Sequence, residues 1–224
     1  MTIIVQSRTG VTLLGAGPLA PGDLDAALAL APGLVAADGG ARHALAAGLP
    51  LQGVIGDMDS LPPEARSALG PELLHPVSDQ DSTDFEKCLR AISAPFLIAA
   101  GFAGGRMDHH AAVLNALVRH PLQRCMVLGA EDICFHCPPE LRLDLPEGTP
   151  LSLFPMAPLR GHGEGLHWPP GGIDFAPWGR IGTSNRTTAG PVRLAFPEPG
   201  MLVYLPRAHL AEAVRALDSA PDPG

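Results

Sequence analysis

The sequence predicts an α/β protein whose two halves differ in texture. In the first half, short apolar segments alternate with helical ones, which is typical of β-α units and of a mainly parallel sheet covered on both faces. After about residue 129, proline and glycine become dense and turns separate short apolar runs, as in a small β-sandwich. We therefore expect a Rossmann-like sheet with helices on both faces in residues 1–130. An all-β sandwich domain with a C-terminal helix is expected in residues 131–224.

The first half contains apolar runs short enough to be buried strands. They lie at residues 11–14, 34–37, 54–55, 73–74, 96–100 and 125–128. Helices are expected at 23–30, 41–46, 62–69 and 82–92, and a further helix follows His109 and continues to about Arg119. Proline and glycine at 32–33 end the first helix, and the prolines at 62–63 begin the third. Each glycine-rich or acidic motif comes directly after a strand, at the edge where open α/β sheets bind ligands.

In the second half we expect strands at 151–154, 192–196 and 201–204 and a closing helix at 208–217. Cys134 and Cys137 form one C-x-x-C motif, which without a second pair is weak support for zinc. The four cysteines show no disulfide-framework spacing, so reduced thiols are expected, the usual state in the cytoplasm.

Composition disfavours several classes of function. With 224 residues, 46% of them hydrophobic, the chain is long enough to bury a core. The formal net charge is −8 and no basic run interrupts it, which argues against nucleic acid as a partner. No apolar run approaches the roughly 18 residues that a membrane-spanning helix needs. We therefore expect a cytoplasmic protein without a membrane partner.

The most informative stretch runs from Ser78 to Leu89 and places three aspartates before an amphipathic helix. Ser82 or Thr83 is the expected N-cap, within a capping box. Asp84 and Lys87 are three residues apart and share a helical face. Lys87 is the only lysine of the chain, and because Lys and Arg differ at phosphate groups, this exception indicates a specific task. The alternative is a capping box with a surface ion pair.

Asp38, Asp57 and Asp59 each follow a predicted strand, and Asp81 and Asp84 lie near a helix start. This set offers only carboxylate oxygens, without His or Cys, and therefore suits Mg²⁺. An N-cap is the alternative for any single aspartate. Several carboxylates on one sheet edge repel one another unless a cation is bound, which favours the metal site.

The segment from Gly101 to Arg106 predicts a strand-to-helix loop with backbone N–H groups free to meet phosphate. Arg106 is a candidate to bind an anion; the alternative is an ion pair with Asp108. His109 and His110 are candidate ligands, although a helix-surface position is the alternative for at least one of them.

Four motifs occur in a characteristic order and spacing: Asp38-Gly-Gly-Ala41, Gly56-Asp-Met-Asp-Ser60, the stretch 79–89 and Gly104-Gly-Arg-Met-Asp108. Together they resemble the thiamine pyrophosphokinase family. In the second half, Gly165-Leu-His-Trp168 and Gly182-Thr-Ser-Asn185 look like the thiamine-contacting segments of the family. The resemblance covers roughly residues 11–204.

The resemblance implies a Mg²⁺-dependent enzyme that transfers the pyrophosphoryl group of ATP to the hydroxyl of thiamine, giving thiamine diphosphate and AMP. It also implies a catalytic nucleotide-binding domain, a thiamine-binding β-domain, and a homodimer with the thiamine site at the subunit interface. The implied metal ligands are Asp38, Asp57, Asp59 and Asp84. The implied catalytic residues are Asp57, Asp59, Asp81, Asp84 and Lys87. Further implied substrate-binding residues are Gly39, Gly40, Gln80, Thr83, Arg106, Asp108, His109, Trp168, Ser184 and Asn185.

For this reaction we expect in-line positioning and charge neutralisation to dominate, with Lys87 and Arg106 beside the metal. The proton acceptor is Asp81 or Asp59, and the sequence leaves this choice open. Trp168 offers a flat face to the cationic thiazolium; the alternative is a tryptophan in the β-domain core. Two other functions remain: a metal-dependent phosphohydrolase of a nucleotide or other phosphorylated small molecule, and a non-catalytic nucleotide- or thiamine-binding module.

Overall fold

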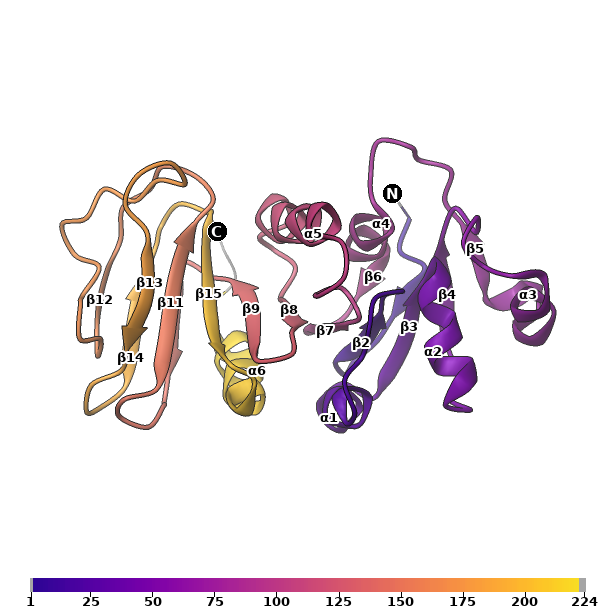
Figure 1. Cartoon of the computed structure of the whole chain (residues 1–224), viewed down its shortest axis with the longest axis horizontal. Helices are drawn as coiled ribbons and strands as arrows, with labels where there is room; N and C mark the ends of the chain where they lie inside the picture. The colour runs from indigo at the N-terminus through magenta and orange to yellow at the C-terminus, as the bar shows by residue number, and fades with distance from the viewer. Residues whose placement is uncertain (1, 222–224) are drawn as a thin grey trace. The chain divides into compact units, whose positions relative to one another are not determined.

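The computed structural model of the chain describes residues 2–221 (Figure 1). The chain divides into two compact units: unit 1 comprises Met1–Ala116 and Val127–Ala130, and unit 2 comprises Leu117–Met126 and Glu131–Gly224. It is a mixed α/β protein with a large multi-strand sheet and a separate antiparallel sheet. Within residues 2–221, no helix has the length and apolar character needed to cross a membrane. The predicted domain boundary at residue 130 stays a prediction.

The strands that pair within unit 1 run parallel. β1 (Val5–Gln6) pairs with β6 (Ile92–Ser93), and β2 (Val11–Leu14) pairs with β7 (Leu97–Ala100). β4 (Gly53–Gly56) pairs with both β3 (Gly33–Ala37) and β5 (Leu74–Pro76). Every residue of β2, β3, β4 and β7 is buried, as expected where a parallel sheet has no solvent-facing side. The two-residue strands β1 and β6 were not predicted.

The helices of unit 1 follow the strands closely. They are α1 (Asp23–Leu30), α2 (Ala41–Ala46), α3 (Pro63–Leu69), α4 (Asp84–Ala91) and α5 (Met107–Arg119), with 3₁₀ turns at Asp38–Gly40 and Pro71–Leu73. The expected helix at 23–30 is confirmed, and α4 ends one residue before the predicted position because the chain continues directly into β6.

Helix α4 is fixed at its start and along one face. Thr83 is its N-cap, because the Thr83 hydroxyl accepts a hydrogen bond from the Glu86 backbone N–H at 3.2 Å. Phe85, Cys88 and Leu89 are buried in the core of unit 1. A cap and an apolar face therefore fix α4, with Asp84 close to Gly56 at the carboxyl end of β4.

Unit 2 contains the antiparallel part of the large sheet and a separate antiparallel sheet. The antiparallel part of the large sheet has the order β13 (Gly182–Arg186), β11 (Pro150–Pro155), β15 (Met201–Pro206) and β9 (Asp132–His136). The other has the order β10 (Glu140–Leu143), β14 (Val192–Ala195) and β12 (His162–Glu164). Helix α6 (Leu210–Ser219) follows a 3₁₀ turn at Arg207–His209 and lies against β10, so the closing helix expected at 208–217 is confirmed with a shift of two residues.

All four cysteines are buried and reduced in the described structure. Cys88 lies on α4, Cys125 on β8 (Cys125–Leu128), Cys134 on β9, and Cys137 directly follows β9. Burial raises the pKa of Cys134 to about 12 and holds the pKa values of Cys125 and Cys137 well above the usual range. These thiols are therefore protonated, as expected for structural cysteines.

Candidate active site

A cavity of about 520 Å³ lies in unit 1, where loops leave the carboxyl ends of the parallel strands. Such an edge gathers polar groups from segments that are distant in sequence. The lining comes from the loops after β2, β3, β4 and β7, from the start of α4 and from α5. Of the predicted site residues, the lining includes Asp38, Gly39, Asp57, Thr83, Asp84, Lys87, Arg106 and His109.

The structure brings Asp38, Asp57 and Asp59 together, with carboxylate oxygens within 4.8 Å of one another. The backbone N–H of Ser60 donates to Asp38 Oδ2 at 3.0 Å, and Ser60 Oγ donates to Asp59 Oδ1 at 2.9 Å. Asp38 and Met58 have positive φ angles of 37° and 67°, which are costly for residues with a Cβ and concentrate at functional sites. The turn at 57–60 therefore brings these three carboxylates close together.

Of the three carboxylates, Asp38 is the one whose charge is least compensated by its surroundings. Its side chain is buried, and within residues 2–221 its Oδ1 atom has no hydrogen-bond partner. Burial raises the pKa of Asp38 to about 6, against the hydrogen bond from Ser60, and the charges of Asp84 and Asp57 add to the rise. A buried carboxylate oxygen without a donor is costly unless a cation meets it. The all-oxygen donor set fits a hard divalent cation such as Mg²⁺.

Lys87 is buried, with 2% of its side chain exposed, so the surface ion pair considered from the sequence is wrong. Its Nζ atom lies 2.9 Å from Asp84 Oδ1 and 3.5 Å from Asp57 Oδ2. Burial alone lowers the pKa of Lys87, but the two carboxylates outweigh it and the net pKa is raised. The Asp59 backbone N–H first, and then Lys87, lower the pKa of Asp57. Lys87 is therefore a charged group between two carboxylates.

Asp84 lies beside the three-carboxylate cluster rather than within it. Its Oδ1 atom accepts from Lys87 Nζ, and a Cβ added to Gly56 would lie 3.1 Å from that oxygen. Its place as a fourth metal ligand stays a prediction.

Two glycine-rich loops form another wall of the cavity. The Gly17 N–H donates to Gly101 O at 2.8 Å, and a Cβ on Gly15 would lie 2.5 Å from that same oxygen, so the close approach requires glycine. Arg42 donates to the Ala16 carbonyl, and His43 Nε2 lies 2.9 Å from Gly17 O. Arg42 and His43 of helix α2 therefore fix the position of the first loop.

Gly40 is a predicted site residue that does not line the cavity. A Cβ on Gly40 would lie 2.2 Å from Leu14 O, so this glycine permits tight backbone packing rather than facing the cavity.

Arg106 pairs with Asp108 through Nη2–Oδ2 and Nε–Oδ1 distances of 2.6 and 3.1 Å, and this pairing lowers the pKa of Asp108 to about 2. Both side chains are mostly exposed, and the ion pair considered from the sequence is present. The side chain of His110 has a buried Nδ1 atom without a hydrogen-bond partner among the described residues.

Gln80 and Asp81 lie in the loop before α4, with exposed side chains that do not line the cavity. The Asp81 backbone N–H donates to Asp79 Oδ1. These two predicted acceptor residues are therefore close to α4 along the chain, but they do not line the cavity.

The predicted thiamine residues lie in unit 2. Trp168 is 56% exposed, so the alternative of a tryptophan in the β-domain core is wrong. Asn185 is buried; its Oδ1 accepts from Trp168 N at 3.2 Å and its Nδ2 donates to Trp168 O at 2.7 Å. Asn185 therefore holds the Trp168 backbone. Ser184 is exposed, with a φ of 61°, and the Arg186 guanidinium lies 5.9 Å from the Trp168 ring centroid.

Several residues near the site were not among the predicted ones. Ser60 ties Asp38 to Asp59, and its place inside the Gly56–Ser60 motif was the available signal. Phe102 lines the cavity and packs against Phe85, with ring centroids 4.7 Å apart. An aromatic residue inside a glycine-rich loop is the sequence signal for Phe102.

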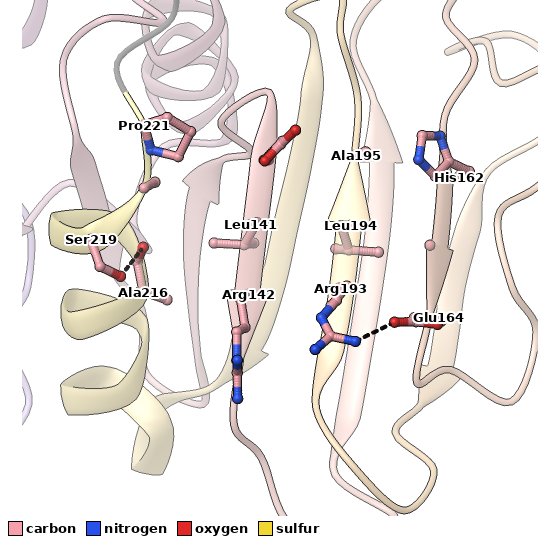
Figure 2. A pocket seen from close by; sticks show the side chains of 13 residues that line it. Leu141, Arg142, His162, Glu164, Arg193, Leu194, Ala195, Ala216, Ser219 and Pro221 are labelled. Carbon is pink, nitrogen blue, oxygen red and sulfur yellow. Dashed lines mark hydrogen bonds and ion pairs between the residues drawn. The ribbon is translucent and has the colours of Figure 1, made fainter.

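A second cavity, of about 530 Å³, lies within unit 2 (Figure 2). It is lined by β10, β12, β14 and the end of α6. Arg193 Nη1 lies 2.6 Å from Glu164 Oε1 across neighbouring strands. Trp168, Ser184 and Asn185 are not part of its lining.

The fold and the acidic cavity together define a class: an α/β protein with a carboxylate cluster and glycine-rich loops at the ends of parallel strands. Residues 24–128 match the family described as "Thiamin pyrophosphokinase, catalytic domain". Thiamine pyrophosphokinase 1 of rice is 31% identical over 158 residues, covering 62% of this chain and 60% of the relative. Thiamine pyrophosphokinase 1 of Arabidopsis thaliana is 30% identical over 149 residues, covering 58% and 56%. The matches thus span less than two thirds of either relative.

The crystal structure of the thiamin pyrophosphokinase of Geobacillus thermodenitrificans shares the fold. It has a TM-score of 0.72 and 21% identity, covering 88% of this chain and 96% of that one. The resemblance found in the sequence is therefore supported: residues 24–128 match the catalytic-domain family, and the relatives that match are thiamine pyrophosphokinases.

Proposed function

We propose that the protein is a Mg²⁺-dependent thiamine diphosphokinase, which transfers the pyrophosphoryl group of ATP to the hydroxyl of thiamine and releases AMP. The observation that carries this proposal is the cluster of Asp38, Asp57 and Asp59, within 4.8 Å, beside buried Lys87. The cluster lies inside the segment that matches the catalytic domain. Two of the four carboxylates contact the Lys87 ammonium, so the group carries excess negative charge, which a metal bound to a triphosphate would neutralise.

In this proposal Asp38, Asp57 and Asp59 hold Mg²⁺, with Asp84 beside them. When bound, the metal supplies charge neutralisation for the triphosphate. Lys87 fixes the directions of the Asp57 and Asp84 carboxylates and adds a positive charge to the site. The loops at 15–17 and 101–105 and the Asp38–Gly40 turn receive the nucleotide. Arg106, Asp108 and His109 bind it from the rim.

The acceptor side of the proposed site carries Gln80, Asp81 and Thr83. Asp81 or Asp59 accepts the proton of the thiamine hydroxyl; both carboxylates are exposed, so either is able to pass the proton to water. Trp168 and Ser184 contact thiamine, and Asn185 keeps Trp168 in place. The proposal includes a Rossmann-like catalytic domain at 1–130, a β-sandwich thiamine-binding domain at 131–224, a cytoplasmic homodimer, and a thiamine site at the subunit interface.

Product identification tests the activity. Purified protein is mixed with thiamine, ATP and Mg²⁺, and the products are separated. AMP with thiamine diphosphate supports the proposal. ADP or free phosphate without thiamine diphosphate supports a phosphohydrolase instead, and binding without turnover supports a non-catalytic module.

Mixing of variants tests the shared site. An Asp57→Asn chain and a Trp168→Ala/Ser184→Ala chain, each inactive alone, are refolded together. A site built from two subunits leaves one intact site in each heterodimer, so part of the activity returns. A site built within one chain stays inactive in every combination.

A further inference from the structure

A hydrogen-bond network joins the loop before α4 to the last turn of that helix. Asp79 Oδ1 accepts from the Asp81 backbone N–H at 3.0 Å. Asp79 Oδ2 accepts from Ser82 Oγ at 2.7 Å and from Arg90 Nη2 at 2.6 Å. Arg90 Nη2 also donates to Ser82 Oγ at 2.8 Å. Four bonds thus connect one carboxylate, one hydroxyl, one backbone amide and one guanidinium.

This network differs from the exposed ion pairs of the chain. About one third of the side chains of Arg90 and Asp79 is exposed, against 70% and 65% for Arg106 and Asp108. Hydrogen bonds from Arg90 first, and then from Ser82, hold the pKa of Asp79 well below its usual range. A charged acceptor with three donors is stronger and more directional than a single surface pair.

Helix α4 does not depend on this network for its position. Thr83 caps the helix and its apolar face is buried in unit 1. The additional element that the network fixes is the loop, because it bonds the residues on either side of Gln80. The side chains of Gln80 and Asp81 remain exposed, while the backbone that carries them is tied down.

We propose that Asp79 and Arg90 are positioning residues for the thiamine side of the reaction. They hold the loop so that Gln80 and Asp81 meet the acceptor, without touching a substrate themselves. This inference rests on the proposed function, which puts the thiamine hydroxyl near these two residues. The inference also gives Asp79 a role different from those of Asp84, which lines the cavity, and Asp81, which is proposed to meet the acceptor.

Steady-state kinetics of Arg90→Ala and Asp79→Asn test the positioning role. Because a misplaced reacting group slows transfer strongly, kcat/KM for thiamine should fall about tenfold or more, while KM for ATP changes by less than about twofold. The double variant should be no worse than the more damaging single variant, because both remove one network. Arg142→Ala is the matched control, since Arg142 pairs with exposed Asp144 at 3.2 Å and has no bond to this loop.

Amide exchange measured by NMR gives a readout that does not depend on activity. Exchange of the Asp81 amide should accelerate in both variants, while the amides of α4 keep their protection. Unchanged thiamine kinetics in both folded variants would overturn the inference. Equal losses for ATP and thiamine, with lowered protection of α4, would also overturn it and indicate a purely structural role.

The same experiments separate this inference from the proposed function. If the wild-type protein forms no thiamine diphosphate, the proposed function fails and the positioning role fails with it. If the wild-type protein forms thiamine diphosphate and the variants keep its kinetics, the proposed function stands and only the inference fails.

Discussion

Two cavities have nearly equal volumes, about 520 Å³ in unit 1 and about 530 Å³ in unit 2, but their charges are arranged differently. In unit 2, Arg193 pairs with Glu164 (Figure 2), and Arg142 pairs with Asp144; all four side chains are mostly exposed. In unit 1, a buried carboxylate has an oxygen without a donor among the described residues. Cavity size therefore does not distinguish the two cavities, whereas unbalanced buried charge does and favours the cavity of unit 1 as the candidate site.

The largest effect is expected at the carboxylate cluster. Asp57→Asn and Asp59→Asn should each remove most of the turnover while the fold persists, because the change removes metal-binding charge and leaves the core untouched. The expected loss is several kcal/mol of transition-state stabilisation, roughly a hundredfold or more in rate. Thiamine diphosphate formation at saturating Mg²⁺ is the measurement, with circular dichroism to check folding. Near-normal activity in either variant would refute the metal assignment.

Lys87→Arg should damage activity although it conserves charge. The ammonium is buried and lies between Asp57 and Asp84, and the larger planar guanidinium does not fit the same space. We expect a loss of about tenfold or more in kcat. Arg193→Lys in unit 2, where the side chain is mostly exposed, is the matched control and should retain wild-type kinetics. Wild-type kinetics for Lys87→Arg would show that its burial has no catalytic purpose.

His136 in unit 2 should make stability fall on acidification. Burial lowers the pKa of His136 from 6.5 to about 4, and its Nε2 accepts from the Gly200 N–H. The unfolded chain takes up this proton first, so the stabilisation is complete above pH 6.5 and is lost as pH falls toward 4. The contribution is on the order of 3 kcal/mol. Urea unfolding of wild type and His136→Gln from pH 4 to 7 should show that the difference between them depends on pH.

Asp38 in unit 1 should have the opposite dependence in chelator-treated protein. Its folded pKa of about 6 exceeds the ordinary value of 3.8, so the folded state keeps the proton longer than the unfolded chain. Its contribution is most favourable below pH 3.8 and is lost as pH rises through 6, at a cost on the order of 3 kcal/mol. Asp38→Asn should be the more stable protein at pH 7 in chelator, as measured by urea unfolding. A wild-type protein that is equally stable there would contradict the buried, uncompensated charge.

The smallest effect is expected in the cavity of unit 2. Arg193→Ala and Glu164→Gln break one exposed ion pair, which is worth between zero and about 1 kcal/mol. Turnover and the urea midpoint should stay close to those of the wild type. A large loss of activity in either variant would show that this cavity takes part in the reaction and would remove the contrast between the two cavities.

The acidic cluster and the cap of α4 were predictable because each rests on local sequence. Asp38, Asp57 and Asp59 each follow an apolar run, and Thr83 precedes a helical segment with a glutamate three residues later. The burial of Lys87 was not predictable, because it depends on how α4 lies over β4. The pairing of β1 with β6 joins segments about 87 residues apart, and two residues carry too little periodicity to indicate a strand.

The role of Asn185 also depends on tertiary structure. The sequence placed it among thiamine contacts, whereas its amide bonds the backbone of Trp168, 17 residues away. Asp79 shows the same limit: three aspartates in six residues look equivalent in sequence, and only the donors around each carboxylate distinguish them. Residue types indicated the chemistry, and long-range contacts assigned the individual tasks.

The positions of the four buried thiols make it possible to measure the local opening of each unit by chemical modification. Cys88 belongs to unit 1, and the other three cysteines belong to unit 2. An alkylating reagent must reach the sulfur atom to react, so enclosed thiols are modified only when the surrounding segment opens. Mass spectrometry of protein pulsed with such a reagent would therefore time the opening of each unit separately, without a probe being introduced. Added nucleotide and Mg²⁺ should then slow modification at Cys88, on the helix that carries Asp84 and Lys87, more than at the thiols of unit 2.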